Sequence, residues 1–131
     1  MVLDKKAALY DRDEEGKLLP REVKLIVDED DEFQSTLAGE TIFVVPMVRG
    51  ELRKMFAKAA MAEKDEDVDV DRDLILNNCM KPKFDKEEIA HIKPWLATAI
   101  VNTILNESGV DVGKKTRRKA MQEAEDDFAK N

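Results

Sequence analysis

The hydrophobic period of the chain changes after Gly50. Before that residue, Val23, Leu25 and Val27 recur at every second position, which is typical of a half-buried strand. A second run, residues 41–45, is rich in β-branched residues and precedes Pro46, which ends a strand or restricts it to a sheet edge. We therefore expect a short two-stranded β element, paired as a hairpin or as one edge of a sheet.

After Gly50, apolar residues recur every three or four positions, as on one face of a helix. An acidic linker over residues 63–69 separates two such patterns. The second pattern predicts a helix that is capped by Asp69 or Asp71, continues through Cys79 and ends before Pro82. The first predicts a helix whose apolar face consists of Leu52, Met55, Phe56, Ala59 and Ala60.

The strongest local signal lies around Asp85. Its carboxylate can cap the first free backbone N–H groups of a helix, and Glu88, three residues later, can complete a capping box. Phe84 and Ile89 have the spacing of a hydrophobic staple across this cap. The pattern predicts a short helix over residues 86–92.

The longest predicted helix covers residues 94–108 and opens on a proline, which suits the first helical position. Gly109 is well placed as a left-handed C-cap, with Val110 folding back on Leu105. Apolar side chains cover most of its circumference, so we expect it to be the central and most buried helix. Its expected core positions include Ile100 and Ile104.

The C-terminal tail has basic residues at its start and acidic residues at its end, an order that opposes the helix macrodipole. Apolar residues nevertheless recur in it at helical spacing. We therefore expect a helix that forms only on contact with a partner. The predicted partner-binding residues are Ala120, Met121, Ala124 and Phe128.

Together these elements predict a mainly α fold, a small helical domain of four to five helices with a short two-stranded β element near the N-terminus. Residues 1–20 would form an N-terminal segment that could be flexible. Residues 21–112 would form the folded helical domain, and residues 113–131 a charged C-terminal tail that is conditionally helical.

Composition narrows the classes of function. The chain has 131 residues and a net charge of −7, which argues against general binding to nucleic acids or anionic membranes. The single cysteine cannot form an internal disulfide, and the N-terminus lacks the pattern of an export signal, so we expect a cytoplasmic protein. The longest apolar runs are far shorter than a membrane span.

Three groups of residues suggest chemistry, and each has a simpler interpretation. Alternating aspartates over residues 65–73 resemble a calcium loop, but glycine and glutamate are missing at loop positions six and twelve. Glu88 and His91 form half of a di-iron motif, and the chain has no second histidine. Cys79 lies on an apolar helix face with nothing nearby to lower its pKa. We expect a non-enzymatic protein with no catalytic, metal-binding or cofactor-binding residues.

The basic segment 114–119 keeps one alternative open, a nucleic-acid-associated accessory protein that contacts phosphates through these residues. Six bases and four acids give residues 114–131 a charge of +2, which leaves −9 on residues 1–113. Because that body would repel nucleic acid, we favour a protein partner.

Five segments of the chain carry a family resemblance: Asp73–Cys79, Lys81–Pro82, Ile92–Pro94, Ile100–Gly109 and Glu125–Asn131. In its helix lengths, prolines and Ser-Gly stop, the chain over residues 50–131 resembles the tail assembly chaperones of long-tailed bacteriophages. The shared pattern contains no catalytic motif.

This resemblance implies a small, acidic, mostly helical protein of the host bacterial cytoplasm that is absent from the finished virion. Such a protein binds the tape measure protein, keeps it soluble and recruits tail tube subunits during tail assembly. Its exposed acids would keep a sticky complex in solution, and its apolar helix faces could hold an amphipathic partner helix. Formation of a homo-oligomer stays open.

Overall fold

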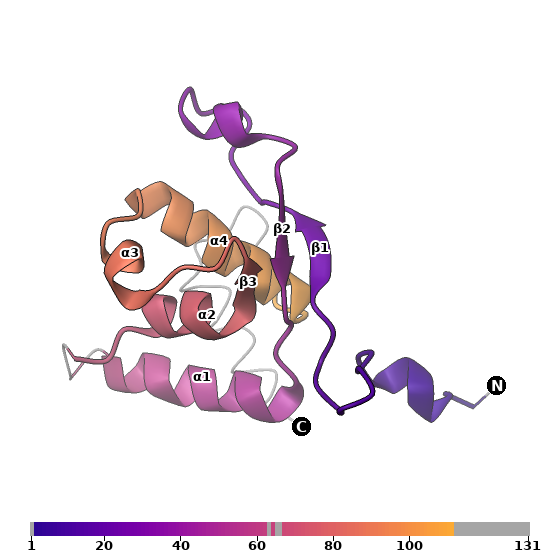
Figure 1. Cartoon of the computed structure of the whole chain (residues 1–131). Coiled ribbons are helices and arrows are strands. Elements are labelled where there is room, and N and C mark those ends of the chain that lie inside the picture. Colours follow the sequence, from indigo (N-terminus) through magenta and orange to yellow (C-terminus); the bar gives the residue numbers. More distant parts are fainter. Residues whose placement is uncertain (1, 63, 65–66, 112–131) are drawn as a thin grey trace.

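The computed structural model describes residues 2–62, 64 and 67–111 of the chain. The described residues form four α-helices, three strands and two short 3-10 helices (Figure 1). In chain order these are η1 (Lys5–Ala8), β1 (Arg21–Lys24), η2 (Gln34–Leu37), β2 (Thr41–Val44), α1 (Arg49–Ala62), α2 (Val70–Asn78), β3 (Cys79–Lys81), α3 (Lys86–Ala90) and α4 (Pro94–Glu107).

The three strands form one antiparallel sheet in the order β1-β2-β3. The two N-terminal strands pair as predicted, with Arg21 opposite Val44 and Lys24 opposite Thr41, but β1 ends at Lys24, before the predicted strand residues Leu25 and Val27. β2 is the central strand, and its inward-facing residues Ile42 and Val44 are buried.

The third strand overturns the prediction of a mainly α fold with a two-stranded β element. The predicted second helix ends at Asn78, and Cys79 has an extended backbone (φ −90°, ψ 113°) and pairs with Val44. Asn78 explains the change, because its backbone carbonyl accepts the Val45 N–H at 2.8 Å and its side chain donates to the Val45 carbonyl at 2.8 Å. A partner 33 residues away decides the conformation here, and the local helical pattern does not.

The helix predicted after Gly50 is confirmed as α1, which buries Leu52, Met55 and Phe56. The predicted apolar face of this helix included Ala60 at its C-terminal end, but Ala60 is exposed. Of the two predicted caps for α2, Asp69 is the N-cap, and its carboxylate accepts the Arg72 N–H at 3.0 Å.

The capping box is confirmed at α3. The Asp85 carboxylate accepts the Glu88 N–H at 2.8 Å, and the Glu88 carboxylate accepts the Asp85 N–H at 3.0 Å. The helix ends at Ala90, two residues earlier than predicted. The N–H groups of His91 and Ile92 each bond to the carbonyl three residues earlier, which tightens the last turn. Lys93 precedes Pro94, and a residue in that position disfavours helical backbone.

Helix α4 is the most buried helix, as predicted. Gly109 has a φ of 90°, and the Val110 N–H bonds to the Leu105 carbonyl at 2.9 Å, which closes the predicted C-cap. Val110 is buried with the helix. The buried residues of α4 are Ala99, Ile100, Val101, Thr103, Ile104 and Leu105.

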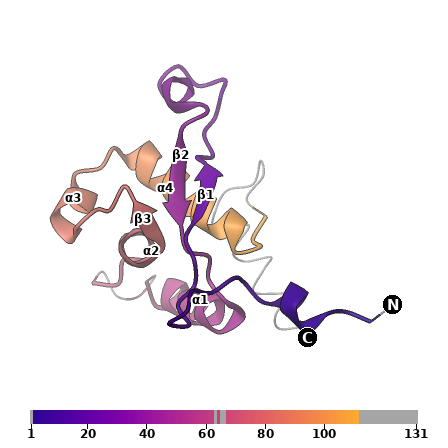
Figure 2. The ribbon, with the colours of Figure 1, turned by 45° about the vertical axis from the view of Figure 1, so that its right-hand side comes forward.

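Helix α4 crosses behind the sheet (Figures 1 and 2), and two buried hydroxyl groups attach it to the segments that follow β1 and β2. The Thr103 hydroxyl accepts the Ile26 N–H at 3.0 Å, and the Ser108 hydroxyl accepts the Met47 N–H at 2.9 Å. In both views α1 and the β1–β2 connection lie at opposite ends of the molecule. No helix in the described part of the chain is long and apolar enough to cross a membrane.

Candidate partner-binding site

A groove with a volume of about 310 Å³ lies between α1 and α2. Met55 of α1 and Leu74 of α2 form part of its apolar lining, and both are buried in the core. The segment between β2 and α1 closes one side of the groove. The further apolar lining residues are Leu18, Val45, Pro46, Met47, Val48 and Val70.

Long-range hydrogen bonds fix the position of this segment. The side chain and backbone of Asn78, the last residue of α2, both bond to Val45. Two residues later, Met47 donates its N–H to the Ser108 hydroxyl, which in turn donates to the Ile104 carbonyl at 2.8 Å. The groove lining is therefore tied to both α2 and α4 by hydrogen bonds.

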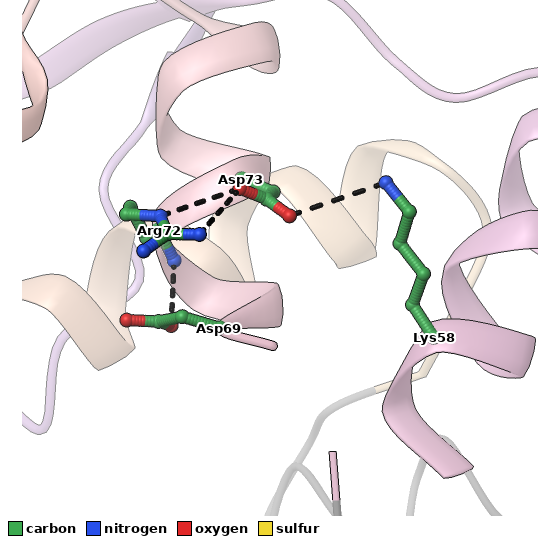
Figure 3. A network of polar contacts seen from close by, with 4 residues as sticks. All are labelled: Lys58, Asp69, Arg72 and Asp73. Carbon is green, nitrogen blue, oxygen red and sulfur yellow. Dashed lines mark hydrogen bonds and ion pairs between the residues drawn. The ribbon is translucent and has the colours of Figure 1, made fainter. Parts of the chain in front are cut away.

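Charged side chains line the mouth of the groove in balanced pairs. Lys58 of α1 lies 4.0 Å from the carboxylate of Asp73 on α2 (Figure 3), and Lys54 lies 3.6 Å from Glu51. Asp73 also accepts from the Arg72 guanidinium at 3.4 Å. Exposed pairs of this kind contribute little to stability, about 0–1 kcal/mol each. They give the groove a polar rim without net charge around an apolar floor.

This combination suits a helix or peptide with apolar side chains on one face. A volume of this size equals that of about ten liquid waters, at ~30 Å³ each, so a few apolar side chains can fill it. Within the described residues no Ser, Cys or His lines the groove, and its charged lining residues pair with one another, Lys54 with Glu51 and Lys58 with Asp73. Recognition of an amphipathic segment is the chemistry that the groove supports.

The residues considered as metal ligands are not brought together in the described part of the chain, where no group of three or more His, Cys, Asp or Glu could hold an ion. Glu88 is engaged in the capping box, and His91 is exposed at the end of α3. Asp69 caps α2, and Asp73 pairs with Lys58 and Arg72. Asp65, the first of the alternating aspartates, lies outside the described residues.

Cys79 is buried at the junction of α2 and β3, and its thiol donates to the Pro82 carbonyl at 3.2 Å. Burial raises the pKa of the Cys79 thiol above its ordinary value, against a smaller lowering by Lys83 and a backbone hydrogen bond. A raised pKa reduces the thiolate fraction near neutral pH, which is the opposite of what a nucleophile needs.

We expect native Cys79 to react with a soluble disulfide reagent at pH 8 at least about tenfold more slowly than in urea, because the thiol must first be exposed by unfolding. The rate is measured from the absorbance of the released thiolate. Free cysteine in the same two buffers is the control for reagent effects. Equal rates in native and unfolded protein would contradict the buried position.

The predicted partner-binding residues Ala120, Met121, Ala124 and Phe128 lie outside the described residues, as does the basic segment 114–119. Both remain predictions. The groove itself was not predicted. Leu18 gave no signal in the sequence, because it precedes every periodic segment and reaches the groove only through the fold.

Comparison of the chain with protein-family models, with curated proteins and with solved structures finds no match, so its function has to be inferred from its own residues.

Proposed function

We propose that the protein is a non-enzymatic tail assembly chaperone of a long-tailed bacteriophage. It binds the tape measure protein in the host cytoplasm, recruits tail tube subunits to it and is absent from the finished virion. The family resemblance of residues 50–131 suggests this role, and the groove between α1 and α2 provides a surface on which it could be carried out.

The groove is the observation that most supports a binding role. A tape measure protein is long and helical, and before the tube forms its apolar helix faces need cover. An apolar groove with a neutral polar rim can take the apolar face of one such helix. The net charge of −7 would help to keep the resulting complex in solution.

Leu18 and Leu19 offer a matched pair of variants for a test. Leu18 lines the groove, whereas the adjacent Leu19 is 42% exposed and does not line it. We expect Leu18→Glu to weaken binding of a tape measure helix at least about tenfold, because it places a charge beside the apolar floor. Binding is measured by fluorescence anisotropy of labelled helical peptides that cover the tape measure sequence.

Leu19→Glu adds the same charge one residue away and should leave the affinity unchanged. If both variants bind every peptide as tightly as the original chain, the groove is not the client site. If the original chain binds none of the peptides, the chaperone proposal itself fails. Gel shifts across a salt series test the alternative, since phosphate binding through residues 114–119 would weaken steeply with added salt.

A further inference from the structure

Lys58 of α1 and Asp73 of α2 face each other from the two helices that border the groove. Both side chains line it, and the Lys58 ammonium lies 4.0 Å from Oδ2 of the Asp73 carboxylate (Figure 3). The Lys58 side chain is 57% exposed, so it can change its rotamer without disturbing the core. A ligand that lies on the apolar floor therefore has an ammonium group within reach.

Asp73 has a second cationic partner. The Arg72 guanidinium contacts Oδ1 of Asp73 from Nε at 3.4 Å and from Nη2 at 3.5 Å, on the side opposite Lys58 (Figure 3). Asp69 accepts the backbone N–H of Arg72 at 3.0 Å. Arg72 is not part of the groove lining, so a ligand in the groove would not displace it. Lys58 can therefore leave Asp73 without leaving that carboxylate unpaired.

The mouth of the groove thus has one positive charge more than its lining residues alone provide. The charged lining residues Glu51, Lys54, Lys58 and Asp73 sum to zero. Arg72 lies outside this sum and compensates Asp73, which leaves the charge of Lys58 in excess. Lys54 differs, because its partner Glu51, 3.6 Å away, has no second cation within the described residues. Lys58 is therefore the cation that a ligand can recruit.

An acidic side chain of a ligand can replace Asp73 as the partner of Lys58 at small cost, because exposed ion pairs contribute little to stability. A basic side chain in the same place is repelled, since it meets Lys58 and an aspartate that already has two cations. The net charge of −7 repels an acidic ligand at long range. Salt at about 0.15 M screens charges beyond about 8 Å, however, and a contact with Lys58 is shorter than that.

We propose that Lys58 determines which ligands the groove selects, and that it favours an amphipathic helix with an acidic side chain at the edge of its apolar face. The apolar face would lie on the floor between α1 and α2, and the acidic side chain would pair with Lys58 in place of Asp73. This inference rests on the proposed function in that a helix binds in the groove, and it adds which helices bind best.

Two designed, labelled helical peptides of identical composition test the proposal. In the first, two glutamates flank a face of leucines and two glutamines lie on the opposite face; in the second, glutamates and glutamines are exchanged. Because net charge and apolar face are the same, only the position of the acids differs. Fluorescence anisotropy measures both affinities in salt of about 0.15 M. We expect the original chain to bind the first peptide at least about threefold more tightly.

Lys58→Gln should remove this preference and leave the affinity for the second peptide unchanged, which verifies that the groove is intact. Arg53→Gln is the matched control, because Arg53 is exposed on the same helix and is not part of the groove lining. It removes the same charge from α1 and should leave the preference as it is.

No binding of either peptide, equal affinities for the two, a preference that persists in Lys58→Gln or one that disappears in Arg53→Gln would each overturn the proposal. None of these results depends on a tape measure sequence. If tape measure peptides bind while the two designed peptides bind equally, the role of Lys58 fails and the chaperone proposal stands. If tape measure peptides do not bind while the preference depends on Lys58, the chaperone proposal fails and the selectivity of the groove stands.

Discussion

Replacing Ile104 with alanine should lower the free energy of unfolding by about 2–5 kcal/mol. Ile104 has none of its surface exposed and lies one turn from the buried Ile100, on the helix around which the sheet and α2 pack. Its truncation removes three carbons from a close-packed interior and leaves a cavity that the rigid helix cannot collapse to fill. Urea denaturation followed by circular dichroism measures the loss.

Asn106→Ala is the control for this substitution, because Asn106 is exposed on the same helix and the change should alter stability by at most about 0.5 kcal/mol. A loss below about 1 kcal/mol for Ile104→Ala would contradict its position in the core. If peptide binding were lost at the same time, the exposed client surface would lie on α4 instead of between α1 and α2.

The starts of α2 and α3 and the end of α4 could be predicted because the chemistry that fixes them is local. Asp69 reaches an N–H three residues away, and Asp85 and Glu88 satisfy each other across the same interval. Gly109 adopts a φ of 90°, a conformation that other residues rarely take, and Val110 folds back only five residues. Signals of this kind are complete within a few consecutive residues, so the sequence displays them.

The third strand could not be predicted in the same way. Residues 79–81 are too few to show an alternating pattern, and they follow directly on a helical one. Their extended conformation depends on Val44, Val45 and Asn78, which the fold brings together from distant parts of the chain. A strand of three residues is set by its neighbour in the sheet more than by its own composition.

The groove could be predicted even less well than the third strand, because it depends on more contacts between distant parts of the chain. Its lining combines Leu18, the segment after β2 and residues of two helices, and the bond from Met47 to Ser108 spans 61 residues. Periodicity could identify the buried faces of α1 and α2, which meet beneath the groove. It could not show that the two helices leave an opening above that contact.

The Thr103 hydroxyl attaches α4 to the segment after β1, so its removal is the second substitution that should strongly lower the stability of the protein. Thr103→Val should lower the free energy of unfolding by about 1–3 kcal/mol although valine has nearly the same shape. The threonine hydroxyl accepts the Ile26 N–H at 3.0 Å and donates to the Ala99 carbonyl at 2.7 Å. Valine offers no acceptor, and a side chain that is 1% exposed admits no water to replace it, so the Ile26 N–H loses its partner.

Thr103→Ser separates this effect from packing, since serine keeps the hydroxyl and loses only a methyl group, which costs about 1 kcal/mol. Amide hydrogen exchange distinguishes the loss of this one hydrogen bond from a general loss of stability. In the valine variant the Ile26 amide should exchange faster, while the neighbouring Leu25 amide, bonded to the Glu40 carbonyl, should keep its protection. In the serine variant both amides should stay protected. Unchanged exchange at Ile26 in the valine variant would mean that this hydroxyl does not attach the helix to the segment after β1.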